Sequence, residues 1–167
     1  MKTKIIPGNP GGGRLPGRKG GTRGLTLTEL IITLALIAIV GAIAMPSFNR
    51  MAVNGNLRSL ARDIQGRIAY LKERAMADST RYTLTFDEAN NCYRSSDMGA
   101  DEWRYASSFG PSIQITSVSF GGVSTVAFET RGTLAQAGHI VLANSRGSTA
   151  TITCNLSGRT YVQFQMK

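Results

Sequence analysis

Residues 25–45, with the sequence LTLTELIITLALIAIVGAIAM, contain one charged side chain, Glu29, in an otherwise largely apolar run. As an α-helix rising about 1.5 Å per residue, this stretch is roughly 30 Å long, which matches the hydrocarbon thickness of a bilayer. Pro46 follows directly, and a proline inside a continuing helix bends it. The run therefore predicts a membrane-spanning helix at residues 25–46, with a kink at Pro46.

The helical pattern continues at residues 47–78 and becomes amphipathic. Apolar side chains recur there at steps of three or four residues, which places them on one face of a helix: Leu57, Leu60, Ile64, Ile68, Leu71 and Ala75. Asp78 and Ser79 end the pattern. We predict one helix over residues 26–77, apolar all round in its first half and with one apolar stripe in its second.

The segment before the apolar run is basic. Residues 1–24 hold six of the chain's 19 lysines and arginines and no acidic residue, so residues 25–167 carry only 13 basic and 10 acidic side chains. Most of the net charge of +9 therefore belongs to a leader at residues 1–24. Because Lys and Arg are retained on the cytoplasmic side of a membrane span, the leader orients the helix. The total charge is weak support for nucleic-acid binding.

From Arg81 onward the apolar period changes to two, as in half-buried strands. Glycine-containing turns separate six strand candidates: residues 82–86, 113–120, 125–129, 139–143, 149–154 and 160–165. The predicted fold class is α+β, with a long N-terminal helix packed against a small antiparallel β-sheet. Residues 79–167 form the predicted β-rich globular domain.

Few side chains suggest chemistry. Cys92 and Cys154 fit no redox or zinc motif, and either a disulfide outside the cytoplasm or two buried small apolar side chains explains them. His139 lies in a strand pattern and is expected at a strand surface or edge. The spacing of an acidic loop near Trp103 fits no calcium-binding loop: Asp97, Asp101 and Glu102. The sequence predicts no enzyme, cofactor or metal site.

The junction of leader and helix reads Arg23-Gly24-Leu25-Thr26-Leu27-Thr28-Glu29-Leu30. A small residue closes the basic leader, the apolar run starts at once, and a carboxylate follows five residues into it. An acid in a membrane span costs roughly 2.5–3.5 kcal/mol at the centre and less near an end, and it indicates function by default. An acid favoured by the N-terminal helix dipole is the alternative explanation of Glu29.

This junction resembles the leader of type IV pilins and pseudopilins, in which a glycine precedes Phe-Thr-Leu-hydrophobic-Glu. Four residues match the pattern: Gly24, Thr26, Leu27 and Glu29. Leu25 replaces the usual phenylalanine, and Thr28 replaces the usual apolar residue. Pro46 falls at the twenty-second position counted from Leu25, where pilins commonly carry a helix-bending proline.

The resemblance implies a mechanism. A prepilin peptidase cuts after Gly24 and methylates the new amino group of Leu25. Glu29 then pairs with the amino terminus of a neighbouring pilin as the helices bundle, which relieves a carboxylate held in lipid. The implied location is the bacterial inner membrane, crossed once, with the N-terminus cytoplasmic and the globular domain periplasmic.

The β-rich part is similar to the GspH/FimT family of minor pseudopilins and minor pilins. The likeness rests on residues 126–132, 139–147 and 152–159. Some pilus members bind DNA through Gly-Arg-x-Arg, but Tyr161 follows Gly158, Arg159 and Thr160 where the second arginine belongs. The sequence thus favours a type II secretion pseudopilin that serves protein export, with a FimT-like minor pilin in pilus assembly or DNA uptake as the alternative.

Other interpretations were weighed. Arg146 and Arg159 would hold a DNA phosphate only if they met across a hairpin, and two solvated turn arginines are the favoured explanation.

A secreted soluble binding domain is a rival of the pilin interpretation, because residues 42–44 (Ala-Ile-Ala) satisfy an ordinary signal-peptide cleavage rule. A single-span anchor that never polymerises is another. Glu29 inside the apolar run, together with the helix continuing beyond it, favours the pilin.

Overall fold

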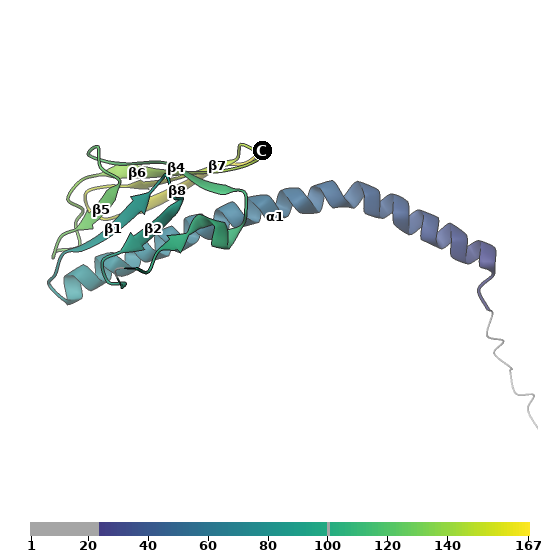
Figure 1. The fold of residues 1–167 in the computed structure, drawn as a ribbon, viewed down its shortest axis with the longest axis horizontal. Coiled ribbons are helices and arrows are strands. Elements are labelled where there is room, and N and C mark those ends of the chain that lie inside the picture. The colour runs from purple at the N-terminus through teal and green to yellow at the C-terminus, as the bar shows by residue number, and fades with distance from the viewer. Residues whose placement is uncertain (1–23, 100) are drawn as a thin grey trace, which may run out of the picture. The chain divides into compact units, whose positions relative to one another are not determined.

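The computed structural model describes residues 24–99 and 101–167, and in this part of the chain one long helix precedes eight strands (Figure 1). The predicted leader thus lies outside the described residues, except for Gly24. Helix α1 comprises Leu27–Ala77. The strands are β1 (Tyr82–Asp87), β2 (Cys92–Ser95), β3 (Arg104–Tyr105), β4 (Ile113–Phe120), β5 (Thr125–Phe128), β6 (Gly138–Asn144), β7 (Thr149–Cys154) and β8 (Thr160–Gln165), and the 3₁₀-helix η1 (Ala106–Phe109) follows β3.

The long helix predicted over residues 26–77 is confirmed. After its last residue the backbone of Ser79 has φ 49°, in the left-handed region where helices often end. The helix assignment runs across Pro46 without a break. The kink expected at Pro46 stays a prediction.

The strands form two antiparallel sheets, so the prediction of a single sheet was wrong. The first has the order β3-β2-β1-β5 and the second the order β4-β6-β7-β8. Apolar alternation indicates which face of each strand is buried, but it does not indicate which strands pair. The α+β class, a long helix against antiparallel strands, is confirmed.

All six predicted strands are present, with ends within one residue of the prediction. The sequence did not predict β2, β3 or η1. These elements have four, two and four residues, which is too short to show a clear period. The segment between β1 and β4 therefore contains more regular structure than its sequence indicates.

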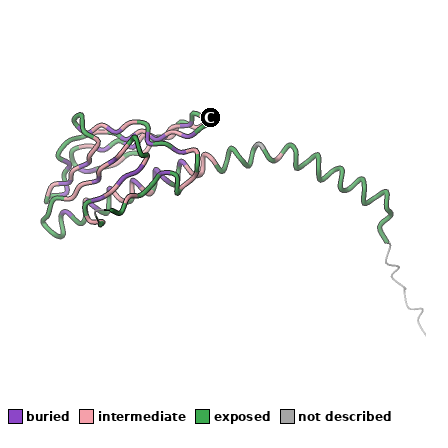
Figure 2. Tube along the Cα trace, in the orientation of Figure 1, coloured by how far each residue is buried: buried purple, intermediate pink, exposed green. Residues whose placement is uncertain are grey.

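The second half of α1 shares one hydrophobic core with both sheets. The six side chains of its predicted apolar stripe are all 0% exposed. The first sheet adds Leu84 and Phe128 to the core, and the second adds Phe120 and Leu142. Burying each such side chain stabilises the fold by roughly 1.5–3 kcal/mol. Figure 2 shows that the buried residues gather in this part of the chain.

Two turns of the second sheet depend on glycine to different degrees. Gly147 precedes β7 with φ 76°, and Gly158 follows it with φ 72°. A Cβ atom on Gly147 would lie 3.5 Å from Lys167 Nζ, an ordinary contact. A Cβ atom on Gly158 would lie only 2.6 Å from the carbonyl oxygen of Gly132. Gly158 is therefore needed for two reasons: its backbone is left-handed, and the absence of a side chain lets its turn approach the turn at Gly132 closely.

The two glycines form a matched test of this packing. Gly147→Ala should cost about 1–2 kcal/mol, because an alanine is strained in the left-handed region. Gly158→Ala should cost a further 1–3 kcal/mol, roughly, because its methyl group would overlap Gly132. Urea denaturation of the full chain in neutral detergent, followed by circular dichroism, measures both losses. Equal losses for the two variants would contradict the proposed close approach.

Candidate functional site

The N-terminal half of α1 exposes its apolar surface on all sides (Figure 2). Every residue from 24 to 40 is exposed. Among the described residues, α1 is the helix whose length and composition suit a membrane span, although a signal sequence shares these properties. An apolar surface of this extent exceeds what a soluble monomer usually exposes, so it indicates a membrane or a partner surface.

The first turn of α1 carries one of the two hydrogen bonds of a capping box. Thr26 is the N-cap residue, and its Oγ1 accepts a hydrogen bond of 3.2 Å from the backbone N–H of Glu29. The N–H of Leu30 donates to the Thr26 carbonyl oxygen at 3.1 Å. Thr and Glu three residues apart are the residue types of this motif. Glu29 thus lies where the helix dipole favours a carboxylate, as the alternative explanation of this residue expected.

The Glu29 carboxylate nevertheless has no cationic partner among residues 24–99 and 101–167. The side chain is exposed, and it forms no ion pair with any residue of the described chain. The first basic residue after it is Arg50, more than five helical turns further along α1. A carboxylate without a cation is costly in lipid. An opposite charge from another molecule would therefore stabilise this site.

The predicted cleavage position is accessible. Gly24, Leu25 and Thr26 are exposed and precede the first helical residue. Nothing lies within 4 Å of the position a Cβ atom of Gly24 would take. A protease can therefore reach the Gly24–Leu25 peptide bond without unwinding α1.

The two cysteines are free thiols in different sheets. Cys92 lies in β2 and Cys154 in β7, and both are buried. Burial raises the pKa of the Cys92 thiol above its ordinary value and that of Cys154 to about 12. Both therefore remain protonated at neutral pH. The structure favours two buried small apolar side chains over the disulfide weighed from the sequence.

The two candidate DNA-contacting arginines do not meet. Arg146 lies in the turn before β7 and Arg159 in the turn after it. The six residues of β7 separate these turns by about 15–20 Å, at roughly 3.3 Å per residue. This separation favours the interpretation of two separate turn arginines over a phosphate shared across a hairpin.

His139 is exposed on β6, which is an inner strand of the second sheet. Its expected place on a strand surface is confirmed, but it is not at a sheet edge. In the described part of the chain, no three His, Cys, Asp or Glu side chains gather as a metal site would require.

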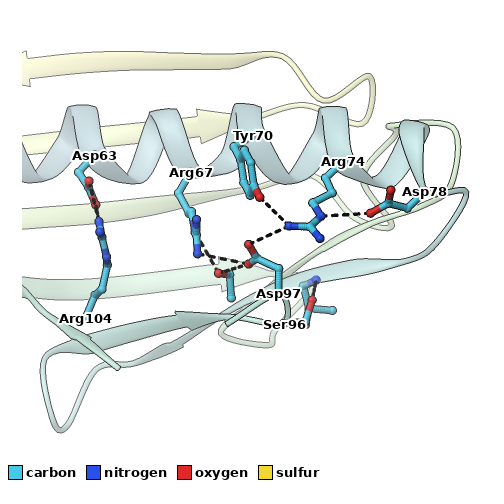
Figure 3. A network of polar contacts seen from close by, with 10 residues as sticks. Asp63, Arg67, Tyr70, Arg74, Asp78, Ser96, Asp97 and Arg104 are labelled. Carbon is cyan, nitrogen blue, oxygen red and sulfur yellow. Dashed lines mark hydrogen bonds and ion pairs between the residues drawn. The ribbon is translucent and has the colours of Figure 1, made fainter. Parts of the chain in front are cut away.

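Asp97, the first residue of the acidic loop after β2, points toward α1 (Figure 3). The Asp97 side chain is only 6% exposed and lies 3.3 Å from Arg67 Nη2 and 3.8 Å from Arg74 Nη1. Ser95 Oγ donates to Asp97, and Arg67 Nε donates to Ser95 Oγ at 2.9 Å. Asp97 therefore fastens the loop to the helix. The sequence could not reveal this role, because the partners are far apart along the chain.

A second contact ties the same region to α1. Arg104 Nη1 donates to both carboxylate oxygens of Asp63, at 2.9 and 3.1 Å (Figure 3). The Tyr93 hydroxyl donates to the same carboxylate. Burial, and then the hydrogen bond to Asp63, raises the pKa of Tyr93 above its ordinary value of 10.0. Tyr93 was not singled out by the sequence, because β2 was not recognised.

Comparisons with known proteins bear on the fold. No protein-family model matches the chain, and no curated protein matches it. A solved structure with a similar fold is the crystal structure of the type IV minor pilin FimU from Pseudomonas aeruginosa. The two chains are 11% identical, and the superposition has a TM-score of 0.50 and covers 66% of this chain and 90% of that one. At this identity the likeness shows a pilin-like fold.

The contact between Tyr93 and Asp63 predicts alkaline sensitivity. The folded-state pKa of Tyr93 exceeds the unfolded value, so its contribution is complete below about pH 10 and is lost as the pH rises further. The free energy of unfolding should fall more steeply in the wild type than in Tyr93→Phe, by up to about 1.4 kcal/mol per pH unit. Denaturation of the full chain from about pH 9 to about pH 11 measures this difference.

Tyr105→Phe is the control, because Tyr105 is 51% exposed. It should keep the wild-type pH dependence. If Tyr93→Phe and Tyr105→Phe behaved alike above pH 10, the buried phenol would not be the group responsible.

Proposed function

We propose that this chain is a non-enzymatic filament subunit of the type IV pilin class. In this proposal residues 1–24 are a cleaved leader, 25–46 the membrane and assembly helix, 47–78 the amphipathic helix of the head, and 79–167 its β-rich domain. The observation that carries the proposal is the Glu29 carboxylate, which forms no ion pair within the described residues and lies at the start of an uncovered apolar helix. The exposed Gly24–Leu25 bond just before it and the pilin-like fold are consistent with this role.

Processing creates the missing partner. A prepilin peptidase in the inner membrane cuts after Gly24, and the new α-amino group of Leu25 carries a positive charge, which a single methyl group retains. When helices bundle, this amine and the Glu29 carboxylate of a neighbouring subunit come together in a medium of low dielectric constant. Removing either partner then leaves an uncompensated charge, at a cost of roughly 3–5 kcal/mol. Assembly is thus coupled to cleavage.

For the setting, we propose the pseudopilus of a type II secretion system, in which the chain is a minor subunit that serves protein export. Tyr161 takes the position of the second arginine of the DNA-uptake pattern, and Arg146 and Arg159 stand apart. A FimT-like minor pilin is the alternative setting, and the likeness to FimU is one of fold and is compatible with either.

Cleavage is tested by the intact mass of protein purified from cell membranes. The mature chain should begin at Leu25 and carry one added methyl group. Gly24→Leu should retain the leader, because a bulky residue replaces the small one before the cut, whereas Gly21→Leu should be processed normally. A chain that begins at Met45 would instead establish the secreted-domain rival, and an unprocessed wild type would refute the pilin proposal.

Assembly is tested at Glu29. Glu29→Leu should still insert in the membrane, because it removes a charge from the apolar run, but it should lower incorporation into sheared filaments at least about tenfold. Glu73→Leu is the control, since Glu73 is exposed on the same helix within the head and forms no ion pair there. Full incorporation of Glu29→Leu would refute the assembly role of Glu29, and absence of the wild-type chain from sheared filaments would support a single-span anchor that does not polymerise.

The same strains identify the setting. Loss of protein export in the Glu29→Leu strain would place the subunit in a secretion pseudopilus, and loss of surface pili would place it in a pilus.

A further inference from the structure

A basic pocket lies where the chain's last residues meet α1. It has a volume of ≈ 400 Å³, and one face of α1 lines it together with Met166 and Lys167. Arg50, Asn54 and Arg58 are spaced four residues apart and thus lie on that face. The pocket therefore combines three cationic side chains with a polar amide.

Hydrogen bonds to Asn54 hold this pocket in shape. Its Oδ1 accepts from Asn144 Nδ2 and from Ser148 Oγ, each at 2.9 Å. Its Nδ2 donates to the carbonyl oxygen of Lys167 at 3.3 Å, and the backbone N–H of Lys167 donates to Ser148 Oγ at 2.9 Å. Asn144 and Ser148 are buried. The last residue is thus fixed beside the helix by groups that α1 and the β6–β7 turn supply.

The cations of the pocket lack anionic partners within the described chain. No ion pair there involves Arg50, Arg58 or Lys167. Arg58 packs over the Phe164 ring, 5.9 Å from its centroid, which leaves its positive charge uncompensated. The sequence holds no acidic residue between Glu29 and Asp63, and Asp63 already binds Arg104.

In the proposed insertion, the end of the pocket that holds Arg50 lies at the depth of the lipid headgroups. Arg50 is four residues beyond residue 46, about 6 Å along a helix, and the headgroup layer is roughly 5–8 Å thick on each side. Helical side chains lean toward the N-terminus, so Arg50 and Arg58 lean toward the membrane. Met51, which is 69% exposed, adds an apolar contact to the same pocket.

We propose that this pocket binds the phosphate of an anionic phospholipid of the phosphatidylglycerol class, an inference that rests on the proposed membrane insertion. A guanidinium group can donate two parallel hydrogen bonds to two oxygens of one phosphate. The Lys167 ammonium adds a third positive charge beside the two arginines. The lipid would fix the head at the membrane surface before the subunit leaves the bilayer. A soluble anion would gain nothing from the apolar lining or from the exposed Ile43, Met45 and Phe48 that precede the pocket.

The test uses the full chain in neutral detergent, with native mass spectrometry to count bound lipids. Phosphatidylglycerol is titrated against phosphatidylcholine with the same acyl chains. The double variant Arg50→Gln/Lys167→Gln should bind phosphatidylglycerol about 25-fold more weakly, because each cation near an anionic lipid contributes roughly fivefold. Binding of phosphatidylcholine should be weak and unchanged.

The matched control is Arg131→Gln/Arg159→Gln, which removes the same charge from exposed turns elsewhere in the head. It should bind phosphatidylglycerol as the wild type does. Equal weakening in both double variants would overturn the proposal in favour of general electrostatic attraction.

Two further outcomes would also overturn it. Displacement of the lipid by inorganic phosphate at equal concentration would make the ligand a soluble anion. Unchanged lipid binding in Arg50→Gln/Lys167→Gln, with lost cross-links to other filament subunits, would make it an acidic protein partner. Lipid counting requires neither leader cleavage nor assembly, so failure here leaves the tests at Gly24 and Glu29 to decide the proposed function separately.

Discussion

The apolar surface of α1 needs cover along its whole length, and the chain covers only its second half. From Leu57 to Ala75 a single stripe faces the core, and both sheets bury it. From residue 24 to residue 40 every residue is exposed, and apolar side chains dominate. Burial of apolar area is the main favourable term in folding, so surface of this extent requires another apolar environment. A bilayer and a bundle of identical helices both provide one.

The half of α1 that is covered is held from both sides of its core-facing stripe. At 100° per residue, Asp63, Arg67 and Arg74 lie on one flank of the stripe, and Asn54 and Lys72 lie on the other. The first flank bonds to the segment that follows β1, through Asp97 and Arg104. The second bonds to the second sheet, where Lys72 Nζ donates to the carbonyl oxygens of Ser157 and Gly158 at 3.2 and 3.4 Å.

This division has a physical consequence. Apolar packing alone would tolerate rotation of the helix by small amounts, whereas polar contacts on opposite flanks allow one orientation. The orientation of each sheet relative to α1 is therefore fixed by its own set of hydrogen bonds and ion pairs. The basic pocket around Asn54 and the loop around Asp97 therefore lie on different flanks of the apolar stripe of α1.

Local patterns in the sequence predict most of this fold. The helix and six strands follow from periods of 3.6 and two. The division into two sheets, β2 and β3, and the contacts of Asp97 and Asn54 do not follow. The bond from Asn54 to Lys167 joins residues 113 positions apart, and a single sequence carries no signal for such a pair. The cap that Thr26 forms on the Glu29 N–H could be predicted, because it requires only two residues three apart.

The Thr26 cap also joins two explanations of Glu29 that the sequence presents as alternatives. A carboxylate at the third helical position gains from the helix dipole and from free N–H groups, so the first turn lowers the cost of placing it near the membrane. The dipole corresponds to only about half an elementary charge, and it does not neutralise a full negative charge in lipid. The cap lowers the cost of the acid within one chain, and in the proposed filament the remaining cost favours a partner that brings a whole positive charge.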